Sequence, residues 1–260
     1  MQWRLIRDGA ARGAWNMAVD EAMLLGQLQA STRGGTLRFY GWSPPCLSLG
    51  RFQRWDEVLD DAPTFDVVRR PTGGRAVWHH HEITYCAVLR EEMLPRGSTS
   101  VAGAYAWLSR GFIAGLQTLG VQATLAPAGN DRVQTPDCFA SATRADFVVD
   151  GRKLLGAAQC RHNGVVLQHG SLLLSVDQEA WQRALGNTHD VVTLQMLGIQ
   201  KSREEIVDTL CAGCEHELGI SLSPGILSDA EATLATRLLA EKYAQPAWNR
   251  ERRAGAAEQT

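Results

Sequence analysis

The sequence lacks the features of membrane and secreted proteins. No uncharged apolar run approaches the roughly 20 residues that a membrane-spanning helix needs. The opening stretch, MQWRLIRDGAARGAW, has no continuous apolar core and no obvious small-residue cleavage site, so it does not look like a secretory signal. We therefore expect a cytoplasmic protein with no membrane partner.

The sequence also has no excess of charge of one sign. Its 26 Lys and Arg residues nearly balance 28 Asp and Glu residues, which gives a formal net charge of -2. No overall field then favours nucleic acid, and we expect none as a partner. One local group of positive charge remains, formed by Arg51, Arg54, Arg69, Arg70 and Arg75.

Six cysteines in a chain of 260 residues do not resemble a disulfide framework, so we expect free thiols. Cys46, Cys86 and Cys160 lie in apolar stretches, where a thiol packs as a small apolar group. Cys211 and Cys214 have CxxC spacing, which is found in redox and zinc sites. However, they lie on one stripe of an expected helix, and no second ligand pair has zinc-site spacing. Both therefore fit a helix core better.

Cys138 has a different setting. Residues 127–137 are rich in Pro, Gly, Asn and Asp, which predicts a loop and an accessible thiol. This thiol is either an ordinary exposed cysteine or a nucleophile. Lys153, after an expected Asp-Gly turn, is either a solvated strand residue or an ammonium held in a site. Beside a thiol, an ammonium would lower the thiol pKa from ~8.5 to ~7 and raise the thiolate fraction at pH 7 from about 3% to about half.

Two further motifs each allow two interpretations. The run His79 to Glu82 suggests a metal cluster, but neighbouring side chains on a strand point to opposite faces, so a single histidine facing a pocket is the better interpretation. The segment from Arg69 to Arg75, RRPTGGR, is either a hairpin turn with solvated arginines or a loop whose glycines let the backbone approach an anionic or carbonyl oxygen. It lacks the GxxxxGK[ST] spacing of a Walker loop.

The pattern of expected elements predicts an α+β fold with a mixed, largely antiparallel sheet and packed helices. Strands are expected at 36–53, broken by two prolines, at 67–68 and at 76–89. A meander over 145–149, 152–161 and 165–174 is expected around the turns Asp-Gly and Asn-Gly. Helices are expected at 16–25, with Asn16 as cap and Gly26 as stop, at 101–119, and after Asp177, Ser202 and Ser228.

Four stretches in this order resemble the biotin/lipoate protein ligase and octanoyltransferase superfamily over roughly residues 1–215. They are NMAVDEAML near the start, RFYGWSPPCLSLGRFQ at 38–53, RRPTGGRAVWH at 69–79, and DGRKLLGAAQ at 150–159, which continues to LQHGSLLL at 167–174. The resemblance implies a single catalytic domain over 1–245, with its core at about 30–215, and a polar tail over 246–260.

The resemblance also implies an acyl-binding pocket with Lys153 as the essential lysine. Cys138, in Pro-Asp-Cys-Phe before the DGRK hairpin, would be the nucleophile of a cysteine-dependent octanoyltransferase. Backbone N–H groups near Gly73-Gly74 or Gly156-Ala157 would stabilise the oxyanion. The substrate-binding residues expected on this basis are Arg70, Thr72, Gly73, Gly74, Arg75, His79, Gly156, Ala157, Gln159, His169 and Gly170.

In that case an octanoyl group would pass from octanoyl-acyl carrier protein through Cys138 to a lysine of a lipoyl domain or glycine-cleavage H protein, with no metal or cofactor. Ligases of the superfamily instead use ATP and need no cysteine. Arg75 stands where ligases usually carry a third glycine, and the sequence after the catalytic region is short for the accessory domain of many ligases. An ATP-dependent lipoate–protein ligase, an amidotransferase between carrier proteins and a non-catalytic acyl-binding module remain alternatives.

Overall fold

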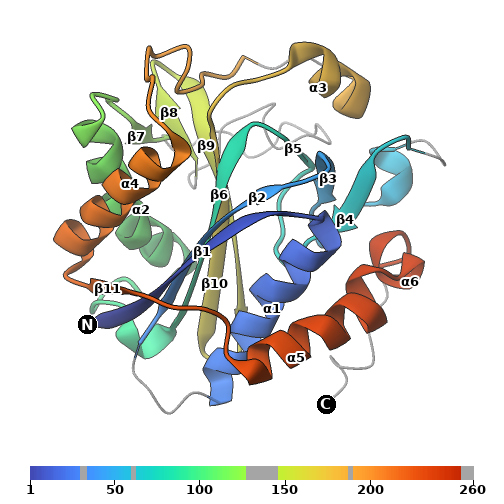
Figure 1. The fold of residues 1–260 in the computed structure, drawn as a ribbon, viewed down its shortest axis with the longest axis horizontal. Helices are drawn as coiled ribbons and strands as arrows, with labels where there is room; N and C mark the ends of the chain where they lie inside the picture. Colours follow the sequence, from blue (N-terminus) through green and yellow to red (C-terminus); the bar gives the residue numbers. More distant parts are fainter. Residues whose placement is uncertain (30–33, 60–62, 127–145, 187–189, 253–260) are drawn as a thin grey trace.

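A computed structural model of the chain describes residues 1–29, 34–59, 63–126, 146–186 and 190–252. An eight-stranded sheet has the order β11-β1-β2-β6-β10-β9-β8-β7 and crosses the middle of the molecule (Figure 1). β1 pairs in parallel with β2 and β11, and the other pairs are antiparallel. The predicted α+β fold with a mixed, largely antiparallel sheet is confirmed. The strands are β1 (Gln2–Ala11), β2 (Thr36–Trp42), β6 (Glu82–Arg90), β7 (Thr124–Leu125), β8 (Phe147–Val149), β9 (Arg152–His162), β10 (Val165–Leu173) and β11 (Ser221–Pro224).

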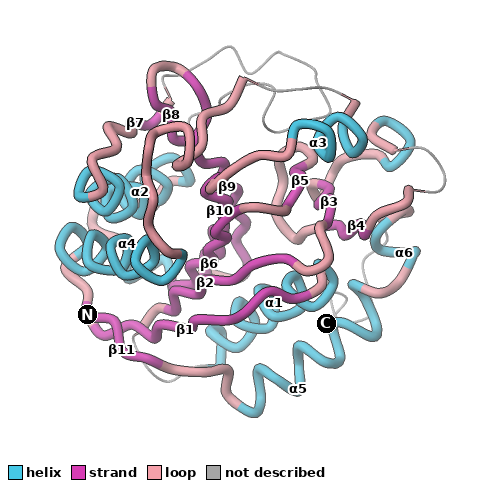
Figure 2. The backbone as a smooth tube through the Cα atoms, turned by 45° about the horizontal axis from the view of Figure 1, so that its top comes forward, coloured by secondary structure: helices cyan, strands magenta, loops and turns pink. Residues whose placement is uncertain are grey.

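Helices cover both faces of this sheet (Figures 1 and 2). On one face, α2 (Val101–Thr118) packs against α4 (Arg203–Leu218). The two backbones approach closely, since a side chain at Gly111 would meet the Cα atom of Cys214 at 2.7 Å. Cys211 and Cys214 are buried in this interface, as predicted. On the other face lie α1 (Gly13–Gln29) and α5 (Asp229–Leu238).

The meander around β9 is confirmed, and its two turns have the expected backbone. Asp150 and Gly151 have φ of 50° and 79°, and Asn163 and Gly164 have φ of 46° and 77°. Two consecutive residues at positive φ match the type I′ turns that these dipeptides favour. The turn at Asn163 and Gly164 joins β9 to β10 and fixes the register that places Gly156 opposite Ser171.

Helix starts were predicted well where a capping box is present. Ser202 and Ser228 cap α4 and α5 with full capping boxes, and Asp177 caps α3 (Gln178–Leu185). The start and end predicted for the first helix were wrong. Asn16 lies inside α1, where its buried amide donates to the Gly41 carbonyl at 2.8 Å instead of capping a helix.

Gly26 does not end α1, because the helix continues to Gln29. A side chain at Gly26 would meet Cγ of Glu231 on α5 at 3.0 Å. The glycine therefore lets two helices approach and is not a stop signal. The spacing of residues in the sequence does not show whether a glycine ends a helix or allows a second helix to approach.

A second, three-stranded sheet lies beside the first, with the order β4-β3-β5. It consists of β3 (Cys46–Leu49), β4 (Asp66–Arg69) and β5 (Val77–His79). The single strand predicted at 76–89 is therefore wrong: β5 pairs with β3, whereas β6 pairs with β2 and β10. The chain bends between them at His80 and His81, whose rings lie 3.6 Å apart.

The chain beyond residue 245 starts with a packed helix, α6 (Pro246–Asn249), although a polar tail was expected from 246. Trp248 is only 2% exposed, and its indole N–H donates to the Arg69 carbonyl at 2.8 Å. The Arg69 guanidinium in turn donates to the carbonyls of Trp248 and Asn249 at 3.1 and 2.8 Å, and to that of Gly50 at 2.8 Å. The C-terminal helix thus holds the base of the Arg69–Arg75 segment.

Replacing Trp248 by alanine should lower the free energy of unfolding by about 3–5 kcal/mol, because a large buried side chain and its cation–π contact with Lys242 (4.0 Å) are lost. Urea unfolding measures this change. Trp15→Ala is the matched control, since Trp15 is only half-buried, and should cost clearly less. Equal losses would contradict a structural role for α6.

Within the described ranges, no helix is both long enough and apolar enough to cross a bilayer. The same residues contain no group of three or more His, Cys, Asp or Glu side chains placed to hold a metal ion. The division of the chain into one catalytic domain and a tail remains a prediction.

Candidate active site

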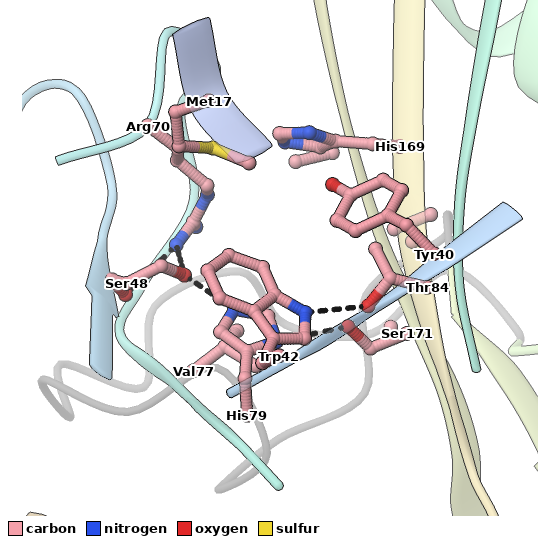
Figure 3. A pocket seen from close by; sticks show the side chains of 14 residues that line it. Met17, Tyr40, Trp42, Ser48, Arg70, Val77, His79, Thr84, His169 and Ser171 are labelled. Atoms are coloured by element: carbon pink, nitrogen blue, oxygen red, sulfur yellow. Dashed lines mark hydrogen bonds between the residues drawn. The ribbon is translucent and has the colours of Figure 1, made fainter. Parts of the chain in front are cut away.

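A cavity lies between the small sheet and four central strands of the large sheet, β2, β6, β10 and β9 (Figure 3). Its wall consists of aromatic rings, strand residues with small side chains and a methionine from α1. The polar side chains in the wall hydrogen-bond other groups of the protein, as described below, so much of the surface offered to a ligand is apolar. The lining residues are Met17, Tyr40, Trp42, Ser48, Arg70, Val77, His79, Thr84, Gly156, Ala157, Ala158, His169, Gly170 and Ser171.

His79 is held in the wall by a hydroxyl on one side and a carboxylate on the other. Its Nε2 lies 2.8 Å from Ser48 Oγ, and its Nδ1 lies 2.6 Å from Oε1 of the buried Glu82. Burial acts to raise the pKa of Glu82, but the charge of His79 and hydrogen bonds from His79, Thr84 and Ser171 lower it overall. The ring also stacks on Trp42 at 3.8 Å. Of the adjacent histidines, His79 is therefore the one that faces the pocket.

His169 is likewise held between a hydroxyl and a carboxylate. Its Nε2 lies 2.7 Å from Thr72 Oγ1, and its Nδ1 lies 3.1 Å from Oδ2 of Asp20. Burial lowers the pKa of His169, which keeps the ring neutral at pH 7. Burial also acts to raise the pKa of Asp20, but His169 and Arg38 lower it overall. If the neutral ring carries its proton on Nδ1 and donates it to Asp20, then Nε2 accepts a hydrogen bond from the Thr72 hydroxyl.

This burial makes stability depend on pH. Because the pKa of His169 is lower in the folded state, the unfolded chain binds more protons below about pH 6.5, and stability falls as the solution becomes acidic, by at most ~1.4 kcal/mol per pH unit. His169→Gln should flatten this slope in urea unfolding between pH 7.5 and 5.5. His216→Gln, at an 83% exposed side chain, should leave it unchanged. An unaltered slope in the first variant would refute the assignment.

Arg70 braces the turn that forms one wall, and does not project from it as a solvated arginine. Its guanidinium donates to the carbonyls of Gly73 and Arg75 at 2.8 and 2.6 Å, and to the Ser48 carbonyl at 3.1 Å. Gly74 has φ of 86°. Its carbonyl lies where any side chain at Gly50 would be, at 1.9 Å. The turn thus requires glycine at both positions.

β9 and β10 supply the opposite wall. Gly156, Ala157 and Gly170 line the cavity, as the resemblance implied. Gly170 tolerates no side chain, because one would lie 2.7 Å from the Tyr85 ring. Gln159 does not line the cavity. Its amide donates at 3.1 Å to Gln168, the residue directly opposite it on β10.

Lys153 is buried, at 3% exposure, and its ammonium lies 2.8 Å from Asp146. Lys153 does not line the cavity, although Ala157, four residues along the same strand, does. The Ala157 amide donates to the other oxygen of Asp146 at 3.4 Å. The solvated alternative for Lys153 is therefore wrong, and the ammonium is held next to the cavity wall.

The five described cysteines are poor nucleophiles. Burial raises the pKa of Cys160 to about 12 and that of Cys211 to about 11. Burial raises the pKa of Cys46, Cys86 and Cys214 further. Their thiols stay protonated at neutral pH. Cys138 lies outside the described residues.

The structure adds residues that the sequence did not single out as site candidates. Asp20 pairs with His169 across 149 positions, and no local signal indicates that contact. Glu82 stood in the run considered as a metal cluster, and it instead pairs with His79, three residues earlier. Asp146 pairs with Lys153 across the turn at Asp150 and Gly151. Four further lining residues stood within the matching stretches without being named as candidates: Met17, Tyr40, Trp42 and Ser48. Of the Arg69–Arg75 segment only Arg70 lines the cavity, and Thr72, Gly73, Gly74 and Arg75 do not. Arg70 and His169 nevertheless contact this turn.

Comparison with known proteins gives a consistent family match. The model of the lipoyl protein ligase A/B catalytic domain matches residues 12–214. An octanoyltransferase LipM of Symbiobacterium thermophilum is 39% identical, with 95% of this chain and 97% of that protein covered. An octanoyltransferase LipM of Bacillus subtilis is 34% identical, with 96% and 98% covered.

Solved structures share the fold. A putative lipoate protein ligase from T. acidophilum has a TM-score of 0.81 at 22% identity, covering 96% of this chain and 100% of that one. A lipoate-protein ligase A bound with ATP also has a TM-score of 0.81, at 21% identity, covering 96% and 99%. At this identity the likeness extends to the fold alone, and it agrees with the sheet described above.

Proposed function

The chain belongs to the lipoyl protein ligase A/B catalytic-domain family, and from this we propose that it is an octanoyltransferase acting through a thioester on Cys138. The Cys138 thiolate attacks the carbonyl carbon of an octanoyl thioester, and the donor thiol leaves. The amine of an acceptor lysine then attacks the new thioester. An amide forms, the Cys138 thiolate is released and the amine loses a proton.

The raised pKa of the other cysteines is the observation that carries this proposal. Transfer through an enzyme thioester needs a thiolate at neutral pH, and burial keeps the five described thiols protonated. This supports Cys138, which the resemblance implied, as our candidate nucleophile. It precedes Asp146 by eight residues in the sequence, and so belongs to the segment that leads directly to the partner of Lys153.

Lys153 supplies positive charge for the thiolate and for the thioester oxygen. Asp146 fixes its ammonium at 2.8 Å and partly offsets its charge, so the effect on the thiol depends on close approach. The Ala157 amide donates to Asp146, which leaves the amides near Gly73-Gly74 as our preferred oxyanion donors.

The cavity suits an alkyl chain. Ser48 and Thr72 direct their hydroxyls at His79 and His169, and the indole N–H of Trp42 donates to Thr84 at 2.8 Å. An apolar chain can therefore enter without leaving these groups unpaired, which would otherwise cost about 1–3 kcal/mol each. We place the octanoyl tail here.

The donor in this proposal is octanoyl-acyl carrier protein, and the acceptor is a lipoyl domain or glycine-cleavage H protein. Incubation of the protein with octanoyl-acyl carrier protein, without ATP, should add one octanoyl mass to the intact chain. Addition of the acceptor should discharge it. An enzyme that acylates the acceptor only with free acid and ATP would instead be the ligase.

A further inference from the structure

An exposed aromatic side chain lies on the outer side of the turn that forms the cavity wall. Phe52 is 74% exposed. A side chain at Gly73 would meet its ring at 3.9 Å. The Gly73 carbonyl accepts from Arg70, which lines the cavity. Phe52 is thus separated from the cavity by the thickness of one turn.

Arginine side chains contact the segment around Phe52. The Arg51 guanidinium lies 6.0 Å from the Phe52 ring centre, and Arg252 donates to the Phe52 carbonyl at 3.0 Å. Arg250, on the same C-terminal segment, lies 4.7 Å above the ring of Trp55. We call Arg51, Phe52, Arg250 and Arg252 the Phe52 surface. It combines residues about 200 positions apart in the sequence.

Acidic side chains lie among these arginines. Glu251 stands between Arg250 and Arg252 in the sequence, and Asp56 and Glu57 both pair with Arg54. The hydrogen bond from Arg54, and to a smaller extent the charge of Arg252, lower the pKa of Asp56. Four arginines of this region, Arg54 included, therefore stand with three acidic residues, in a chain whose net charge is -2. Burial, and after it the charges of Arg252 and Arg70, lower the pKa of the neighbouring Arg69 to about 10, which agrees with a positive local field.

We infer that the Phe52 surface docks the acidic carrier protein that delivers the octanoyl group. This inference rests on the proposed function. Such a carrier presents its acyl thioester on an arm joined by a phosphodiester, so both the arm and the carrier surface are anionic. Arginines pair well with phosphate and carboxylate, and an exposed phenylalanine supplies an apolar contact. The acceptor offers a lysine and no phosphate, which favours the donor.

The test compares a protein-borne donor with a small one. Loading of the enzyme is followed by mass spectrometry without acceptor, from octanoyl-acyl carrier protein or from S-octanoyl-N-acetylcysteamine, which carries neither protein nor phosphate. Phe52→Ala and the double variant Arg250→Glu/Arg252→Glu should raise the half-saturating carrier concentration about tenfold. The maximal loading rate and loading from the small thioester should change less than twofold.

Matched controls are exposed residues that do not belong to the Phe52 surface. Ile226→Ala removes another exposed apolar side chain (81% exposed), and Arg237→Glu reverses an exposed charge on α5. Both should load like the unmodified protein. Loading from the carrier should also slow as salt rises from 25 to 300 mM, and the double variant should lose most of this dependence, because rim charges act through screened attraction.

Three results would overturn the inference. These are unchanged loading from the carrier in both variants, an equal loss with both donors, or normal loading with a raised requirement for the lipoyl-domain acceptor. The last would make the Phe52 surface the acceptor site. If the unmodified protein fails to load from either donor, the proposed function itself fails, which is a separate outcome.

Discussion

Cys138→Ser should abolish transfer, lowering the rate of acceptor octanoylation at least 10³-fold. A serine hydroxyl is almost fully protonated at neutral pH and is a much weaker nucleophile than a thiolate. Intact-protein mass spectrometry after incubation with octanoyl-acyl carrier protein should show the added octanoyl mass in the unmodified protein and no such mass in the variant.

Cys160→Ser is the matched control. Cys160 is half-buried, so its thiol is not fully enclosed, but its pKa is raised to about 12. This variant should form the adduct and turn over within about twofold of the unmodified protein. An octanoyl adduct that persists in the Cys138 variant would exclude Cys138 as the nucleophile.

Replacing Lys153 by methionine should raise the pH at which Cys138 is alkylated by about 1.5 units, because removal of a nearby cation disfavours the thiolate. Ionisation alone would then lower acylation at pH 7 by roughly 15-fold. Iodoacetamide labelling of Cys138 as a function of pH measures the shift. The same change leaves the buried Asp146 carboxylate without its 2.8 Å partner, and should cost about 3–5 kcal/mol of stability.

The double variant Lys153→Met/Asp146→Asn separates the two effects. With both buried charges removed, stability in urea unfolding should recover most of the loss, whereas alkylation should still need the higher pH. If the double variant restored both stability and loading rate, Lys153 would be a structural ion-pair member only. An unchanged alkylation profile in both variants would exclude an electrostatic role.

Several features of the fold follow from the sequence alone, because they depend on local chemistry. Asp-Gly and Asn-Gly fix two hairpins by their tolerance of positive φ, and Ser202 and Ser228 begin helices through capping boxes, each completed by a glutamate three residues later. The stripe that contains Cys211 and Cys214 buries both thiols. Motif order also indicated the family and most of the cavity wall.

Other features depended on which elements meet in space. Gly26 resembles a helix stop, yet it is the point where α1 and α5 approach, and residues 76–89 resemble one strand, yet they enter two sheets. Asp20 on α1 reaches His169 on β10, 149 positions away, only because the helix packs on the sheet.

The sequence by itself determined the local turns and caps, because each depends on residues a few positions apart. Through its resemblance to the family it also supplied Cys138 and Lys153 as candidate groups. Tertiary structure alone decided the ionisation of the buried thiols, His169 and Asp20, and the union of residues near 51 and 252 in one surface. Burial and long-range contact set these properties, and neither can be read from neighbours in the chain.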